Sequence, residues 1–115
     1  MRFLILEDDT QRVNFFIERF GQHHLDITEN ANEAIEYLKE FTYDYIFLDN
    51  DLGTGNGEGL DVAKFLEKTS NPNCGTTIVI HSWNTVAASN MLRCIPGSNR
   101  APYGTDQFYD LLCYI

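Results

Sequence analysis

The chain has 115 residues, of which 43% are hydrophobic and 13% aromatic, and this composition predicts one globular domain over residues 1–115 rather than a disordered chain. Seventeen acidic and eight basic side chains give a formal net charge of −9, which argues against nonspecific nucleic-acid binding and against docking on anionic membranes. The three cysteines form no CxxC pair, and the amino-terminal apolar run is too short for a signal peptide or a membrane span. We therefore expect a reduced, cytoplasmic protein.

Strand and helix patterns alternate along the chain. Short apolar runs predict strands, and apolar residues three or four positions apart predict helices. The expected strands cover residues 3–6, 24–28, 45–48 and 77–80, followed by a short, degraded fifth strand within about 99–103. The expected helices cover 10–20, 31–38, 60–66, 86–95 and 105–112, and residues 70–75 are expected to form a polar turn.

This alternation predicts a particular fold. Short connections between strands and helices are typical of βαβ units, which build a parallel sheet with helices on both faces. We expect a doubly wound, flavodoxin-like α/β domain with strand order 2-1-3-4-5. Asp9 or Thr10, Asn30 and Thr105 are the expected N-caps of three of its helices.

Polar residues follow three of the predicted strands at the point where each strand ends. Glu7 and Asp8 follow the first strand, Asp49 and Asp51 the third, and His81 the fourth. The expected strand order places these ends side by side, and carboxylates that crowd together repel one another unless a proton or a cation lies between them. We therefore predict a divalent-cation site for Mg²⁺ or Mn²⁺. The alternative is that these acids only cap helices and lie along a solvated edge.

Two neighbouring features have more than one interpretation. Glycines at 53, 55, 57 and 59 follow the third strand, but no lysine follows them as in a P-loop, so we expect a flexible lip over the site. Trp83 is expected either to pack against the domain or to act as a lid or a base-stacking platform.

Three segments resemble the receiver domains of two-component response regulators, the CheY-like domains: residues 3–8, 32–38 and 43–49. In receivers an acidic pair and the strand-three Asp hold Mg²⁺, and that Asp accepts a phosphoryl group. The resemblance implies that Glu7 and Asp8 are the acidic pair, that Asp49 is the acceptor, and that the main chain of Asp51 is the third metal ligand.

The chain departs from the receiver pattern at two positions. Receivers usually have Ser or Thr directly after strand four, where His81 stands here with Ser82 one step later. They also carry Lys-Pro near the end of strand five, where this chain has Ala101-Pro102 preceded by Arg100, and no lysine follows Lys68.

A second resemblance is closer in its motifs. The residues 49–53, Asp-Asn-Asp-Leu-Gly, and 81–84, His-Ser-Trp-Asn, resemble paired motifs of a receiver-like variant named for a predicted role in processing cyclic phosphates. This resemblance implies a metal-dependent phosphodiester or cyclic-phosphate hydrolase. In that interpretation Asp49 and His81 are catalytic, with His81 protonating the leaving oxygen. The expected phosphate-binding residues are Ser82, Asn84, Arg12 and Arg100.

Three functional hypotheses remain open at this point. The first is an acidic metal site that acts on a phosphate ester, with a phosphate-containing small molecule as its substrate. The second is a stand-alone response regulator that receives a phosphoryl group from a phosphodonor at Asp49. The third is a degenerate receiver that serves only to bind a protein partner.

Overall fold

The computed structural model describes residues 1–69 and 75–115 and contains a five-stranded parallel sheet in the order β2-β1-β3-β4-β5. The strands are β1 (Arg2–Leu6), β2 (His24–Thr28), β3 (Tyr45–Leu48), β4 (Thr77–Ile80) and β5 (Asn99–Arg100). The helices are α1 (Thr10–Phe20), α2 (Ala31–Glu40), α3 (Gly59–Lys68), α4 (Thr85–Cys94) and α5 (Asp106–Leu112). This confirms the predicted flavodoxin-like fold. The predicted turn at 70–75 lies, except for Gly75, outside the described residues.

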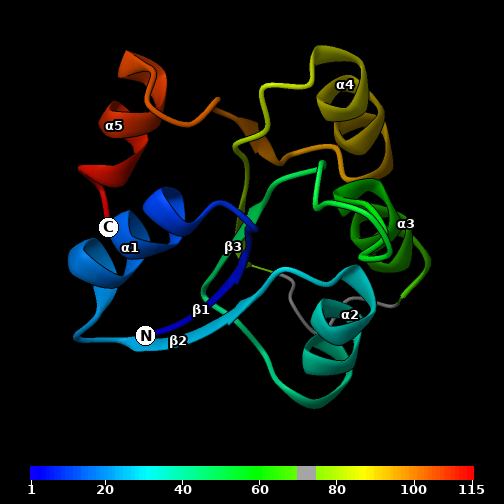
Figure 1. The fold of residues 1–115 in the computed structure, drawn as a ribbon, viewed down its shortest axis with the longest axis horizontal. Coiled ribbons are helices and arrows are strands. Elements are labelled where there is room, and N and C mark those ends of the chain that lie inside the picture. Colours follow the sequence, from blue (N-terminus) through cyan, green and yellow to red (C-terminus); the bar gives the residue numbers. More distant parts are fainter. Residues whose placement is uncertain (70–74) are drawn as a thin grey trace.

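The helices cover both faces of the sheet, α1 and α5 on one face and α2, α3 and α4 on the other (Figure 1). Successive residues of a strand point to opposite faces, so the apolar run of β1 serves both cores. Phe3 and Ile5 pack in the core with α1 and α5, whereas Leu4 and Leu6 pack in the core with the other three helices. All four are completely buried, which explains why β1 lacks polar alternation.

The fifth strand is short, as predicted, but the segment after it stays beside β4. Only Asn99 and Arg100 are paired as a strand. Two further backbone hydrogen bonds continue the contact, from Ala101 N–H to the Ile80 carbonyl and from Tyr103 N–H to the His81 carbonyl, each 2.9 Å. Residues up to 103 are therefore held alongside the end of β4.

Three predicted N-caps are confirmed, and they fix where helices begin near the carboxyl edge of the sheet. The Asp9 and Asn30 side chains each accept a hydrogen bond of 3.0 Å, from the Arg12 and Glu33 amides. Thr105 accepts from the Phe108 amide at 3.2 Å. Asn84 caps α4 in the same way, although this cap was not predicted from the sequence.

No helix among residues 1–69 and 75–115 is both long enough and apolar enough to cross a membrane. Cys94 and Cys113 are free thiols, and Cys74 lies outside the described part of the chain.

Asp26 on the edge strand β2 joins three segments of the domain. Its carboxylate accepts hydrogen bonds from the Arg2 guanidinium at 3.0 and 3.1 Å and from the Tyr43 hydroxyl at 2.7 Å. Burial raises the pKa of Asp26, but the hydrogen bonds from Tyr43, Arg2 and His24 outweigh it and leave this pKa below its usual value. The ionised carboxylate therefore stabilises the fold.

We predict that Asp26→Asn lowers the free energy of unfolding at pH 7 by about 1–2 kcal/mol, since charge-assisted hydrogen bonds contribute on this scale. Because the folded-state pKa is depressed, this stabilisation is present above the unfolded value of about 3.9 and is lost as the pH falls through the folded value. Urea unfolding of the wild type and Asp26→Asn at several pH values from 7 to 3 should show that the difference in their free energies of unfolding shrinks on acidification. The exposed Asp110→Asn is the control, and an equal difference at both pH values would contradict the prediction.

Candidate metal and phosphate site

The register of the sheet brings three strand ends to one place. Leu6 of β1 and Ile80 of β4 both pair with Leu48 of β3, so the residues that follow these strands stand in a row across the sheet edge. Those residues are Glu7, Asp49 and His81, and each offers a ligand atom within 4.8 Å of the other two. The predicted convergence of polar groups from separate segments is present in the structure.

Glu7 is almost completely buried and uses both carboxylate oxygens. Its Oε1 lies 2.8 Å from His81 Nε2, and its Oε2 accepts the Asp8 and Asp9 amides at 3.0 and 3.1 Å. Burial raises the pKa of Glu7, but the hydrogen bond and charge of His81, helped by the Asp9 amide and Arg12, bring it down to about 2. Glu7 is therefore a carboxylate, and His81 Nε2 must be the donor in the bond between them.

His81 lies beneath the site rather than in its opening. The side chain has no exposed surface, and the ring packs edge-on against Phe16, with ring centroids 5.5 Å apart. Its Nδ1 is buried and has no hydrogen-bond partner among the described residues. With Nε2 bonded to Glu7, the imidazole holds this carboxylate in place from behind.

The pKa values of Asp49 and Asp8 are both raised at this edge of the sheet. Burial raises the pKa of Asp49 to about 6, and the nearby Glu7 charge adds to this effect while His81 opposes it. Burial and the Glu7 carboxylate also raise the pKa of Asp8, which remains exposed at the surface. Burial and the neighbouring Glu7 charge both disfavour the ionised forms of Asp49 and Asp8, and a bound cation would offset both effects.

Asp51 forms an outer part of the site together with two asparagines. Asn50 Nδ2 donates to Asp51 Oδ1 at 3.1 Å, and Asn84 Nδ2 lies 3.3 and 3.4 Å from the two Asp51 oxygens. Asn84 Oδ1 is occupied as the cap of α4, where it accepts the Ala87 amide. Ser82 is buried, and its Oγ accepts the Asn84 amide at 3.0 Å. These bonds tie the loop after β3 to the loop after β4.

A cavity of about 230 Å³ opens above this cluster. Its walls are formed by Glu7, Asp8, Asp9, Arg12, Asp49, Asp51, Trp83 and Asn84. A neighbouring hollow of about 560 Å³, between the ends of β1 and β2, shares Glu7 and Asp8 with it. All four predicted metal ligands therefore line one space, together with the predicted phosphate-binding residues Arg12 and Asn84.

The other predicted site residues lie outside this space. His81 and Ser82 are buried behind the wall of the cavity. Arg100 sits on β5, is not part of the wall, and its buried Nε has no hydrogen-bond partner among the described residues.

Arg12 is the only basic residue that lines the cavity in the described part of the chain. Its guanidinium Nη1 lies 3.7 Å from Glu7 Oε1, and its Cζ lies 4.9 Å from the centroid of the Tyr103 ring. A guanidinium held between a carboxylate and an aromatic face is oriented, and it is well suited to pair with a phosphate oxygen.

The glycine-rich loop passes close to the acidic residues. Gly53 has a φ of +84°, a left-handed conformation that favours glycine, and a Cβ at this position would lie 3.9 Å from Asp8 Oδ2. At Gly59, a Cβ would lie 1.9 Å from the Asp49 carbonyl oxygen, so α3 can begin this close to Asp49 only with glycine. The expected flexibility of this loop stays a prediction.

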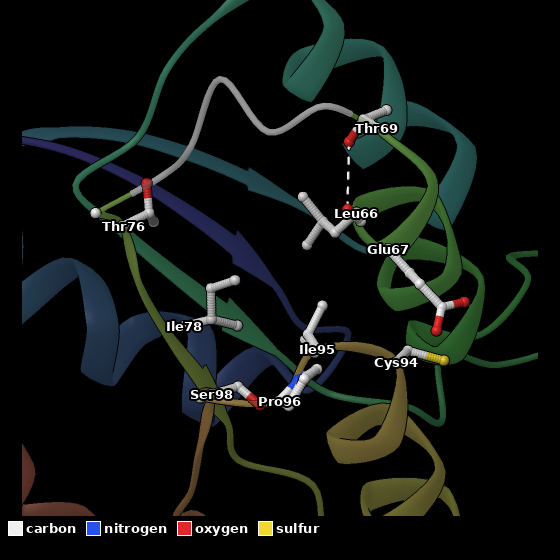
Figure 2. Close-up of a pocket in the computed structure, with 11 residues that line it drawn as sticks. Leu66, Glu67, Thr69, Thr76, Ile78, Cys94, Ile95, Pro96 and Ser98 are labelled. Atoms are coloured by element: carbon white, nitrogen blue, oxygen red, sulfur yellow. Dashed lines mark hydrogen bonds between the residues drawn. The ribbon is translucent and has the colours of Figure 1, made fainter.

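A further cavity of about 400 Å³ lies between the carboxyl ends of α3 and α4 and the start of β4 (Figure 2). Leu66, Ile78, Cys94, Ile95 and Ser98 are among its lining residues. It contains none of the predicted metal or phosphate ligands, so the acidic cavity is the candidate functional site.

Residues 3–96 match the family of cyclic-phosphate processing receiver domains. This match spans most of the chain, and the protein therefore belongs to that family. No curated protein matches the chain.

Solved response regulators share the fold at low sequence identity. A CheY-like receiver domain from Methanospirillum hungatei is 18% identical with a TM-score of 0.75, and the alignment covers 98% of this chain and 88% of that one. TrrA from Thermotoga maritima, solved in complex with Mg²⁺ and BeF, is 18% identical with a TM-score of 0.72, covering 98% and 96%. The phosphorylated cyanobacterial phytochrome response regulator RcpA is 16% identical with a TM-score of 0.74, covering 98% and 86%.

Two residues that shape the site were not predicted from the sequence. Asn50 is 3% exposed, bonds to Asp51, and accepts the Leu60 amide at 3.0 Å, so it links the site to α3. Its position between two acids was the available signal. Asp9 was predicted only as a helix cap, yet it also lines the cavity.

We predict that the buried Glu7–His81 pair is energetically coupled. A double-mutant cycle of Glu7→Gln and His81→Ala, measured by urea unfolding in a chelator-treated buffer, should give a coupling free energy of about 1 kcal/mol or more. The matched control is the exposed Glu36–Lys39 pair, 3.0 Å apart, whose coupling should be close to zero. Additive effects in the Glu7–His81 cycle would contradict the predicted coupling.

Proposed function

We propose that this receiver domain binds a divalent cation, Mg²⁺ or Mn²⁺, at its acidic cavity and hydrolyses a phosphate ester, in particular a cyclic phosphate. The observation that carries the proposal is the convergence of Glu7, Asp8, Asp49 and Asp51 on one small cavity, where burial and neighbouring charge raise the pKa of two of them. The substrate is a phosphate-containing small molecule, and we propose a cytoplasmic location.

The donor chemistry of the site fits a hard divalent cation. Carboxylate and main-chain oxygens are the preferred ligands of Mg²⁺ and Mn²⁺. Asp8 and Asp49 would hold the ion, with Glu7 and the side chain or main chain of Asp51 completing the set. Such an ion, when bound, polarises a phosphate oxygen and lowers the pKa of a coordinated water. The Mg²⁺ present in the structurally similar TrrA supports this assignment.

The remaining residues would bind the phosphate ester and protonate its leaving oxygen. Arg12 would pair with a phosphate oxygen from inside the cavity, and the Asn84 amide, now shared with Asp51, would donate to a second. Arg100 would need to move to take part, because it does not line the cavity. His81 holds Glu7 in place, and it would protonate the leaving oxygen only after Nε2 releases that carboxylate.

The metal site is tested by thermal unfolding. A ligand that binds only the folded state stabilises that state. Mg²⁺ or Mn²⁺ at a concentration about a hundredfold above its dissociation constant should therefore raise Tm by about 5 °C or more. Asp49→Asn and Asp8→Asn should each reduce this rise. The control Asp110→Asn, an exposed carboxylate on α5, should retain it. An unchanged Tm in both metals would contradict the metal site.

The reaction is tested with adenosine 2′,3′-cyclic phosphate followed by phosphorus NMR. We expect metal-dependent ring opening that falls by about a hundredfold or more in Asp49→Asn, since metal and acid–base contributions are of that size. Asp110→Asn is again the control. Metal binding without any turnover would contradict the hydrolase proposal while leaving the cation site standing.

A second candidate function is phosphoryl transfer to Asp49. The phosphorylated state of the structurally similar RcpA favours it, as does the position of Asp49 in the cavity wall. Incubation with acetyl phosphate and Mg²⁺ should then add one phosphoryl group to the intact mass, and Asp49→Asn should abolish the addition. An unchanged mass would exclude this function. If metal binding, turnover and phosphorylation were all absent, protein-partner binding would remain as the role of the domain.

A further inference from the structure

Trp83 is a large, exposed aromatic side chain at the edge of the acidic cavity. It stands between the end of β4 and the start of α4, is 59% exposed, and lines the cavity together with Asp49 and Asp51. Exposed apolar residues are common when they are scattered over a surface. Trp83 differs because it lines the cavity where all four candidate metal ligands meet.

The indole is anchored rather than free. Its Nε1–H donates to the Tyr103 carbonyl at 2.9 Å, and the Tyr103 amide in turn donates to the His81 carbonyl at 2.9 Å. The ring is therefore tied to the frame of β4 and to the segment that follows β5. A pre-oriented aromatic ring loses little conformational freedom when a ligand covers it, which makes it an efficient contact surface.

The size of the cavity limits what it can enclose. Pockets that bury most of a drug-sized ligand usually measure about 300–1,000 Å³. The acidic cavity, at about 230 Å³, is smaller. It has room for a phosphate and the atoms next to it, so the rest of a larger substrate must extend over the rim, where Trp83 presents its exposed ring.

We propose that Trp83 stacks against the base of a nucleoside cyclic phosphate whose phosphate lies in the acidic cavity near Arg12. This inference rests on the proposed hydrolase function and narrows its substrate class to nucleotides. Every base offers a π-face, so stacking on an indole discriminates nucleotides from base-free esters without selecting one base. Trp83 is then a specificity-determining residue, while the acidic cavity carries the chemistry.

The chain contains a single tryptophan, so intrinsic fluorescence reports directly on this ring. In the presence of Mg²⁺, adenosine 2′,3′-cyclic phosphate should change the Trp83 emission in a saturable way, whereas base-free ethylene phosphate should leave it nearly unchanged. The wild type should favour the nucleotide in kcat/KM by about fivefold or more, which is the lower end of the effect of one stacked base.

Variants separate stacking from a structural role. Trp83→Ala should abolish the preference for the nucleotide and keep activity on ethylene phosphate, and Trp83→Phe should restore part of the preference. Val86→Ala, at a 72% exposed position in the first turn of α4, is the matched control and should keep the preference.

Three results would overturn the inference. If wild type and Trp83→Ala hydrolysed the nucleotide with the same preference over ethylene phosphate, Trp83 would have no role in substrate choice. The proposed hydrolase function would remain intact. If Trp83→Ala lost activity equally on both substrates, Trp83 would act by holding the neighbouring Asn84 in place and not by stacking on the base. A wild type that neither binds nor hydrolyses either ester would refute the hydrolase proposal, and the stacking role with it.

Discussion

The hydrogen bond between Glu7 and His81 is the interaction on which the site depends. An ionised carboxylate inside a domain is costly unless a donor compensates it, and Glu7 receives donors on both oxygens. The bond crosses β3 to join the ends of β1 and β4, so Asp49, at the end of β3, must lie beside a fixed negative charge. Burial raises the pKa of Asp49, and this neighbouring negative charge adds to the effect.

The site therefore has two layers. In the inner layer, Glu7, Asp49 and His81 are almost fully buried and held by the sheet and its hydrogen bonds. In the outer layer, Asp8 and Asp51 are exposed and face the cavity. The inner layer fixes the positions of the buried side chains and the negative charge at the base of the cavity, while the exposed side chains of the outer layer can adjust to a ligand. Receivers carry a lysine near the end of strand five; in this chain the Arg12 guanidinium lies near Glu7, and His81 donates a hydrogen bond to that carboxylate.

Much of the fold could be predicted because its signals are local. Apolar runs, helical spacing and capping residues such as Asn30 depend on neighbours in the sequence, and the strand ends at Glu7, Asp49 and His81 followed from the expected strand order. The roles within the site were harder to predict. Residue type alone suggests that His81 faces a substrate, but its position below the cavity depends on packing against Phe16 and on the bond to Glu7.

The same limit applies to the phosphate-binding residues. Arg12 and Arg100 look equivalent in the sequence, yet the α1 residue lines the cavity and the β5 residue does not. Asn50 and Asn84 each donate to Asp51 and also accept a helix amide, and such paired bonds depend on loops that meet only in the folded chain. Local patterns therefore locate this site, whereas tertiary packing assigns its members.

Binding of a divalent cation among the acids at the carboxyl edge of the sheet is the central claim, and crystals grown with Mn²⁺ test it most directly. The claim predicts an anomalous difference peak in the acidic cavity, within coordination distance of carboxylate oxygens of both Asp8 and Asp49. A well-ordered cavity that contains no peak, with Asp8 and Asp49 bonded only to protein groups and water at saturating Mn²⁺, would contradict it.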